Sequence, residues 1–100
     1  MYMGNVKLLS IKKSTIKGKK YTAVFQLKDN KTKTTHFGAS GYTDFIKSGG
    51  DVKRKKAYIA RHKKENWTTP MTAGTLSRYV LWNKPSLSSS IADYKKRFNL

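Results

Sequence analysis

The chain has 100 residues, of which 22 are Lys or Arg and 5 are Asp or Glu, so its formal net charge is +17. This length fits a single small domain, residues 1–100, and 37% hydrophobic and 12% aromatic residues suffice for a modest core, which excludes an unfolded polybasic tail. The absence of cysteine excludes disulfides and thiolate metal sites.

The first part of the chain, residues 1–38, predicts strands. Residues 6–12 form the first one. Strict alternation places on one face Val6, Leu8 and Ser10, and on the other Lys7, Leu9 and Ile11. The basic segment that follows, residues 12–20, contains a glycine and predicts a solvated loop, with a phosphate-contacting loop as the alternative.

A β-hairpin is the clearest local pattern. Residues 20–28 alternate strongly, and Asp29-Asn30 then supplies turn residues. The return strand, residues 31–37, is rich in threonine. The apolar face of the first hairpin strand consists of Tyr21, Ala23, Phe25 and Leu27. Together with residues 6–12, the hairpin predicts a three-stranded antiparallel sheet with one face on the core.

The middle segment, residues 38–50, contains four glycines and predicts a linker between the sheet and the helices. We expect Tyr42, Phe45 and Ile46 to anchor a short turn or helix there. The glycine spacing matches neither a phosphate-binding P-loop nor a dinucleotide fingerprint.

A strongly basic helix is predicted from Asp51 to about Lys64, with Asp51 as its N-cap. Seven of the residues 53–64 are Lys or Arg, and none of the residues in that range is acidic. Its apolar seam is predicted to be narrow and to pair Val52 with Ile59. Such a helix can rest on a small core and still present a basic surface.

Two further helices are predicted. Thr72 caps a helix from Ala73 to about Trp82, and Ser86 or Ser88 begins the last one, although a capping box at Ser90 is also compatible. The apolar face of the last helix consists of Leu87, Ile91, Tyr94 and Phe98. The fold class is therefore α+β, with an N-terminal antiparallel sheet of about three strands in residues 1–38 and about three short helices in residues 51–98.

The sequence predicts a protein that is not an enzyme. The five acidic residues lie far apart, and each suits a turn, a cap or an ion pair. With only His36 and His62 as histidines, a zinc site of the usual ligands is not expected. We expect no catalytic residue, cofactor, metal or small-molecule substrate.

The density of positive charge predicts binding to nucleic acid, foremost DNA, mainly through phosphates and with little sequence preference. Lysine outnumbers arginine, and lysine acts mainly as a point charge. The candidate contact residues are Lys53, Arg54, Lys55, Lys56, Arg61, Lys63, Lys64, Arg78, Lys95, Lys96 and Arg97.

Several short motifs in residues 36–98 carry a family likeness. They are Phe37-Gly38, Tyr42-Thr43-Asp44-Phe45, Tyr58-x-x-Arg61-His62, Glu65-Asn66-Trp67, Thr72-Ala73-Gly74, Leu81-Trp82-Asn83-Lys84-Pro85, and Ser90-Ile91-x-Asp93 leading to Lys96-Arg97-Phe98. With these motifs the chain resembles a family of small basic proteins encoded by large nucleocytoplasmic DNA viruses and some of their algal or protist hosts. The resemblance implies a component of the virion, present in the host cytoplasm or nucleus during infection. It covers roughly residues 36–98 and does not include the first predicted strand.

The same resemblance supports an alternative function from a different class. A minor capsid or cement protein would contact capsid proteins or an anionic inner membrane. Such a protein is expected to expose apolar patches for its protein neighbours, whereas a DNA-binding protein is expected to present one continuous basic face.

Overall fold

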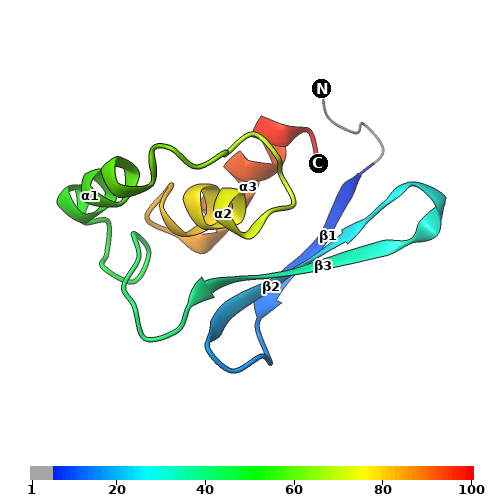
Figure 1. The fold of residues 1–100 in the computed structure, drawn as a ribbon, viewed down its shortest axis with the longest axis horizontal. Helices are drawn as coiled ribbons and strands as arrows, with labels where there is room; N and C mark the ends of the chain where they lie inside the picture. The colour runs from blue at the N-terminus through cyan, green and yellow to red at the C-terminus, as the bar shows by residue number, and fades with distance from the viewer. Residues whose placement is uncertain (1–5) are drawn as a thin grey trace.

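The computed structural model describes residues 6–100, apart from the side chain of Asp29 (Figure 1). In chain order the elements are β1 (Lys7–Lys13), β2 (Lys19–Gln26), the 3-10 turn η1 (Lys28–Asn30), β3 (Thr32–Ala39), α1 (Val52–His62), α2 (Ala73–Leu76), the π-helical η2 (Ser77–Leu81) and α3 (Leu87–Phe98). A three-stranded antiparallel sheet followed by three helices confirms the predicted α+β fold.

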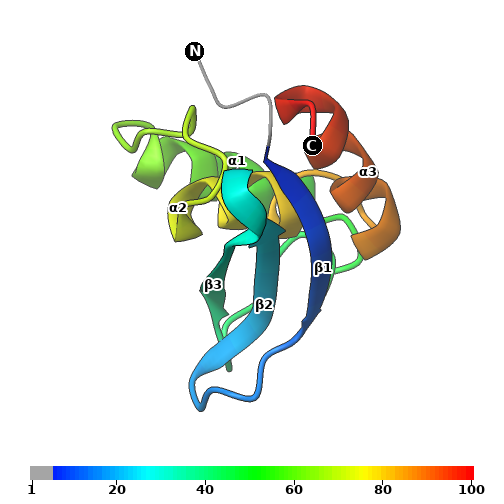
Figure 2. The ribbon, with the colours of Figure 1, turned by 90° about the vertical axis from the view of Figure 1, so that its right-hand side faces the viewer.

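The sheet has the order β1-β2-β3, with both neighbouring pairs antiparallel. The predicted alternation of the hairpin is confirmed, because Ala23, Phe25 and Phe37 are fully buried. Figures 1 and 2 show the helices gathered on one side of the sheet, where these residues meet the helical core. Among the described residues, no helix is both long and apolar enough to cross a lipid bilayer.

The strict alternation predicted for the first strand is wrong after Leu8. The register shifts between Leu8 and Ser10, so that Leu8 lies opposite Phe25 and Ile11 lies opposite Ala23. This β-bulge adds one residue to β1 and moves the following side chains to the other face. Leu8 and Ile11 therefore both pack against the core, and Leu9 is exposed.

The predicted apolar seam of α1 is also wrong in one residue. Val52 is 54% exposed, and the buried residue of the helix is Tyr58, with Ile59 half-buried beside it. A single large ring reaches the core from a helix that otherwise carries cations, and it supplies the apolar contact that Val52 does not make.

In the linker, the structure separates the three predicted anchors. Phe45 is buried and Ile46 is half-buried, but Tyr42 is 72% exposed. The segment forms turns without a regular helix. It is held by hydrogen bonds from the Phe45 N–H to the Leu81 carbonyl (3.0 Å) and from the Lys47 N–H to the buried Asp44 carboxylate (2.7 Å).

The predicted helix starts are confirmed. The Asp51 carboxylate accepts from the Arg54 N–H (3.3 Å), and the Thr72 hydroxyl accepts from the Thr75 N–H (3.2 Å). Of the alternatives for the last helix, Ser86 is the N-cap, since its hydroxyl accepts from the Ser89 N–H (3.2 Å).

The second helix changes its winding part of the way along. It starts as α2 and continues as η2, where the Trp82 N–H donates to the Ser77 carbonyl five residues earlier (3.1 Å). Leu76 and Val80 are fully buried and form the core-facing side of this helix. The wider turn carries Ser77 and Trp82 toward α1 and so prepares one wall of a cleft.

Candidate nucleic-acid interface

The cations in and just after α1 point in three directions. Four lysines are exposed on the side away from the core, and we call them the outer lysines: Lys53, Lys56, Lys63 and Lys64. The two arginines, Arg54 and Arg61, line a cleft on one flank of the helix. Lys55 is half-buried and turns toward the core.

The outer lysines carry charge that no described side chain balances. The acidic groups that the structure describes already have partners: Asp44 pairs with Lys20, Asp51 with Arg54, Glu65 with His62 and Asp93 with Arg97. Within this part of the chain, no ion pair reaches an outer lysine. The face is therefore an uncompensated cluster of positive charge on α1 and the turn that follows it.

Lys55 has a structural role. Its Nζ donates to the Asn83 carbonyl (2.8 Å) and lies 4.9 Å from the centre of the Phe45 ring. Burial, assisted by the nearby Arg78 guanidinium, lowers the pKa of Lys55 from its ordinary value. These contacts join α1 to the segment after η2, so this lysine is not part of the outer face.

Arg78 likewise lies inside the fold. Its guanidinium sits 5.4 Å from the Trp67 ring and 4.8 Å from the Tyr79 ring, and Nη1 donates to the Trp82 carbonyl (2.8 Å). Its Nε is buried and has no hydrogen-bond partner among the described residues. Burial lowers the pKa of Arg78. Arg78 and Lys55 therefore do not belong to the surface that we assign to nucleic acid below.

The last turn of α3 forms a separate basic surface. Lys95 and Lys96 are exposed, and Arg97 pairs with Asp93 (3.2 Å) and lies over the Tyr79 ring (4.4 Å). Figures 1 and 2 place this turn beside the start of β1, away from α1. The predicted contact residues thus fall on two surfaces and in the interior.

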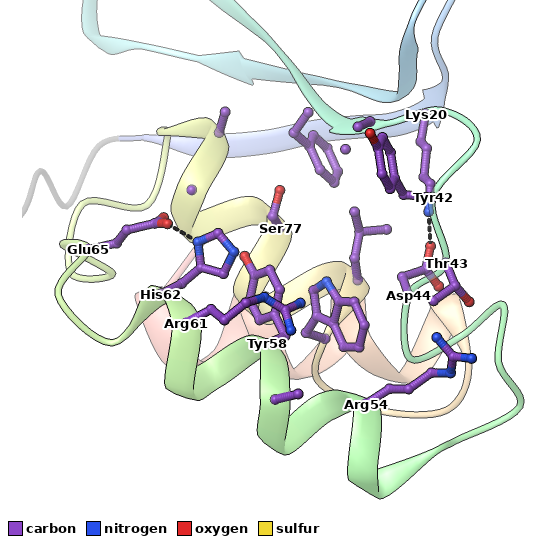
Figure 3. A pocket seen from close by; sticks show the side chains of 18 of the residues that line it. Lys20, Tyr42, Thr43, Asp44, Arg54, Tyr58, Arg61, His62, Glu65 and Ser77 are labelled. Carbon is purple, nitrogen blue, oxygen red and sulfur yellow. Dashed lines mark hydrogen bonds and ion pairs between the residues drawn. The ribbon is translucent and has the colours of Figure 1, made fainter.

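A cleft of about 620 Å³ lies between α1, the end of β3 and the α2–η2 helix (Figure 3). Its walls come from segments far apart in the sequence, which is why the sequence did not reveal it. The lining side chains with polar or aromatic groups are Lys19, Lys20, Phe37, Tyr42, Thr43, Asp44, Arg54, Tyr58, Arg61, His62, Glu65, Ser77 and Trp82.

One wall of this cleft is a stack of three rings. The Tyr58 ring lies between Trp82 (4.7 Å between centroids, 10° between planes) and His62 (4.3 Å, 30°). Tyr58 and Trp82 are buried, and the stack ends at His62, whose side chain is 36% exposed. Burial, with a contribution from the Glu65 charge, raises the pKa of Tyr58 to about 12. Its hydroxyl therefore stays a donor at neutral pH.

The opposite wall is fixed by an ion pair. Lys20 Nζ donates to Asp44 (2.5 Å), and the side chain of Asp44 is only 6% exposed. This pair holds the linker against the sheet and places Tyr42 and Thr43 at the rim (Figure 3). The sequence allowed Asp44 a turn, a cap or an ion pair and did not identify Lys20 as its partner.

A family model described as "Family of unknown function (DUF5754)" matches residues 9–62. The match runs from β1 to the end of α1, so it includes the strand that the viral resemblance left outside and ends before most of the motifs that carried that resemblance. Comparison with curated proteins and with solved structures found no match.

Proposed function

Because the chain belongs to this family of unknown function, defined over more than half of its length, we propose its function from its own surface: it binds nucleic acid without enzymatic chemistry. The contacts are mainly with phosphates and show little sequence preference. The outer lysines form the primary contact surface, with Lys95 and Lys96 as a second one.

The observation that carries this proposal is the uncompensated charge of the outer lysines. A folded chain of net charge +17 gains little from concentrating four unpaired cations on one helix and the turn after it, because they repel one another. A polyanion relieves that repulsion and releases its own counterions on binding. Lysines suit such contacts, because a compact point charge binds phosphate without selecting a base.

We further propose, from the resemblance to proteins of large DNA viruses, that the nucleic acid is a viral genome. In that case the protein is virion-associated and is present in the host cytoplasm or nucleus during infection. Mass spectrometry of purified virions checks this location, and a protein found only in uninfected cells contradicts it.

The decisive experiment is a titration of the purified protein with a 30-base-pair duplex of arbitrary sequence at several salt concentrations. The test variant replaces the outer lysines with alanine: K53A, K56A, K63A and K64A. We expect the slope of log K against log salt to flatten by roughly 0.9 for each phosphate that the variant no longer neutralises, so by up to about 3.6.

The matched control removes the same charge from exposed positions outside α1, in β1, in the β1–β2 connection and just before β3: K7A, K12A, K17A and K31A. It should alter the slope much less, because both variants carry the same net charge and only the position differs. An equal effect of the two variants would show that total charge, and not the outer face of α1, determines binding.

The alternative function, a capsid cement that contacts capsid proteins or an inner membrane, requires an apolar surface. The large apolar side chains exposed in the described residues are Leu9, Ile16, Tyr42 and Val52. They are single residues of four different segments, so no segment of the described residues exposes a run of large apolar side chains, and we keep nucleic-acid binding as the first proposal. A wild-type protein that does not bind the duplex near physiological salt would reverse this preference.

A further inference from the structure

We infer that the cleft between α1 and the end of β3 binds one unpaired nucleotide of the nucleic acid, an inference that rests on the proposed function. The outer lysines hold the backbone of the strand, and the cleft beside them receives a single base with its phosphate. The protein should therefore prefer single-stranded segments and strand ends to a continuous duplex.

The size of the cleft suits such a ligand. A volume of about 620 Å³ lies within the range of roughly 300–1,000 Å³ in which proteins bind small ligands. A base paired inside a duplex cannot enter, because it must first leave the helical stack. An unpaired nucleotide enters without that unstacking cost.

The balance of charge in the cleft favours a phosphate. Arg54 and Arg61 are seven residues apart on one flank of α1, about 10 Å along the helix. Lys19 lies on the opposite side and, like Arg61, makes no ion pair with a described group. Asp44 is paired with Lys20, and Glu65 contacts His62. Even with His62 counted as neutral, the lining cations Lys19, Lys20, Arg54 and Arg61 outnumber these two carboxylates. The free charge that remains is positive.

The hydrogen-bond donors of the cleft also favour a nucleotide as the ligand. The hydroxyls of Tyr58 and Ser77 and the indole N–H of Trp82 line the cleft without a hydrogen-bond partner among the described residues. Figure 3 shows Tyr58 and Ser77 on facing elements beside His62. These donors are available to a ligand, and the oxygens and ring nitrogens of a nucleotide can accept hydrogen bonds from them.

Aromatic rings supply the recognition of a base. Tyr42 stands at the rim of the cleft and is 72% exposed, an unusual position for a large ring that no described residue covers. His62 offers the free end of the ring stack. Proteins bind single strands by combining such rings with a basic surface, because every base has a face that can stack.

The experiment compares a 5′-phosphorylated single strand of 12 nucleotides with a blunt duplex of the same sequence, by fluorescence anisotropy. Tyr42→Ala should weaken single-strand binding by about tenfold, as expected when one base no longer stacks on a ring, and should change duplex binding by less than about twofold. Arg61→Gln should also lower single-strand affinity more than duplex affinity. Lys56→Gln, an outer lysine, is the control and should weaken both alike.

A direct readout locates the ligand. In ¹H–¹⁵N spectra recorded with dAMP, with the single strand and with inorganic phosphate, the indole N–H of Trp82 should shift and that of Trp67, which does not line the cleft, should stay in place. A shift with the strand alone identifies a strand nucleotide as the ligand, and a shift with dAMP as well shows that a free nucleotide also enters.

Two results would overturn the inference: equal loss of single-strand and duplex affinity in Tyr42→Ala, or inorganic phosphate reproducing the full shift of Trp82. Wild-type protein that binds neither DNA would instead refute the proposed function itself, so the two failures are distinguishable.

Discussion

At the scale of single residues, Tyr58 links the core of the protein to its candidate site. Its ring anchors α1 against Trp82, and its hydroxyl faces the cleft. Because burial raises the pKa of Tyr58 to about 12, the folded state favours the neutral phenol. This preference contributes stability that is fully present below pH 10, the ordinary pKa of tyrosine, and is lost as the pH rises toward 12.

An alkaline titration followed by absorbance at 295 nm tests this assignment. We expect Tyr58→Phe to remove a deprotonation step near pH 12 and to reduce the loss of stability between pH 10 and 12. An unchanged late step in Tyr58→Phe would contradict the buried position of this phenol.

Gly38 shows how closely the sheet approaches the second helix. Its φ is +80°, and a Cβ atom there would lie 2.8 Å from Leu81 Cδ1 and 3.1 Å from Lys20 Cβ. Both the backbone and the packing therefore require glycine at this position. Gly38→Ala should lower the free energy of unfolding by about 2–4 kcal/mol, measured by urea denaturation.

Gly18→Ala is the matched control for this substitution. Gly18 has a similar φ of +88°, but nothing lies within 4 Å of a Cβ built there. Gly18→Ala should lower the free energy of unfolding by about 1–2 kcal/mol, because it adds only the backbone strain of a positive φ and no steric contact. Equal losses in the two variants would argue against the close contact between β3 and Leu81.

At the scale of elements, the sequence predicted features that depend on neighbouring residues better than features that depend on contacts between elements. The caps at Asp51 and Thr72 are short-range hydrogen bonds, so the local sequence was sufficient to predict them, whereas for the last helix it left three serines open and the structure has Ser86. The bulge in β1 was not predictable from alternation, because it depends on how β1 pairs with β2. The cleft was missed for the same reason, since four separate segments build it.

The candidate contact residues illustrate this limit on α1. The composition of residues 51–64 identified a basic helix but could not show which of its cations face the solvent and which turn toward the core. Lys55 differs from its neighbour Lys56 only in helical phase, yet it turns inward to the Asn83 carbonyl. The direction in which each lysine points depends on which apolar side chain packs the helix against the core. The sequence suggested Val52 for this role, and in the structure it is Tyr58.

This difference between neighbours is testable. Lys55→Ala should lower the free energy of unfolding by about 1–3 kcal/mol, because it leaves the carbonyl of the buried Asn83 without its donor. Lys56→Ala should change it by less than about 0.5 kcal/mol. Urea denaturation gives both values. Equal effects would mean that Lys55 is as free as an outer lysine.

At the scale of the whole molecule, repulsion among cations dominates the electrostatics. The described residues contain three ion pairs between Lys or Arg and a carboxylate, and one His62–Glu65 contact, against a net charge of +17. Added salt therefore screens more repulsion than attraction. We expect the melting temperature to rise as sodium chloride increases from about 20 to 300 mM, within the range where the screening length falls toward 8 Å and below.

Calorimetry at several salt concentrations measures this dependence. The fourfold alanine variant of the outer lysines provides the comparison: it should melt higher than the wild type at low salt and depend less on salt. A melting temperature that is flat or falls with salt would show that the few ion pairs outweigh the repulsion.

The order of the strands has one more consequence. With β2 in the centre, β1 and β3 each keep one edge that no described strand pairs, and such edges invite a second chain to add a strand. The exposed lysines Lys7, Lys12 and Lys13 on β1 and Lys33 on β3 keep copies apart by repulsion. A polyanion that neutralises them removes this protection, so aggregation should be most pronounced where protein and anionic charge balance.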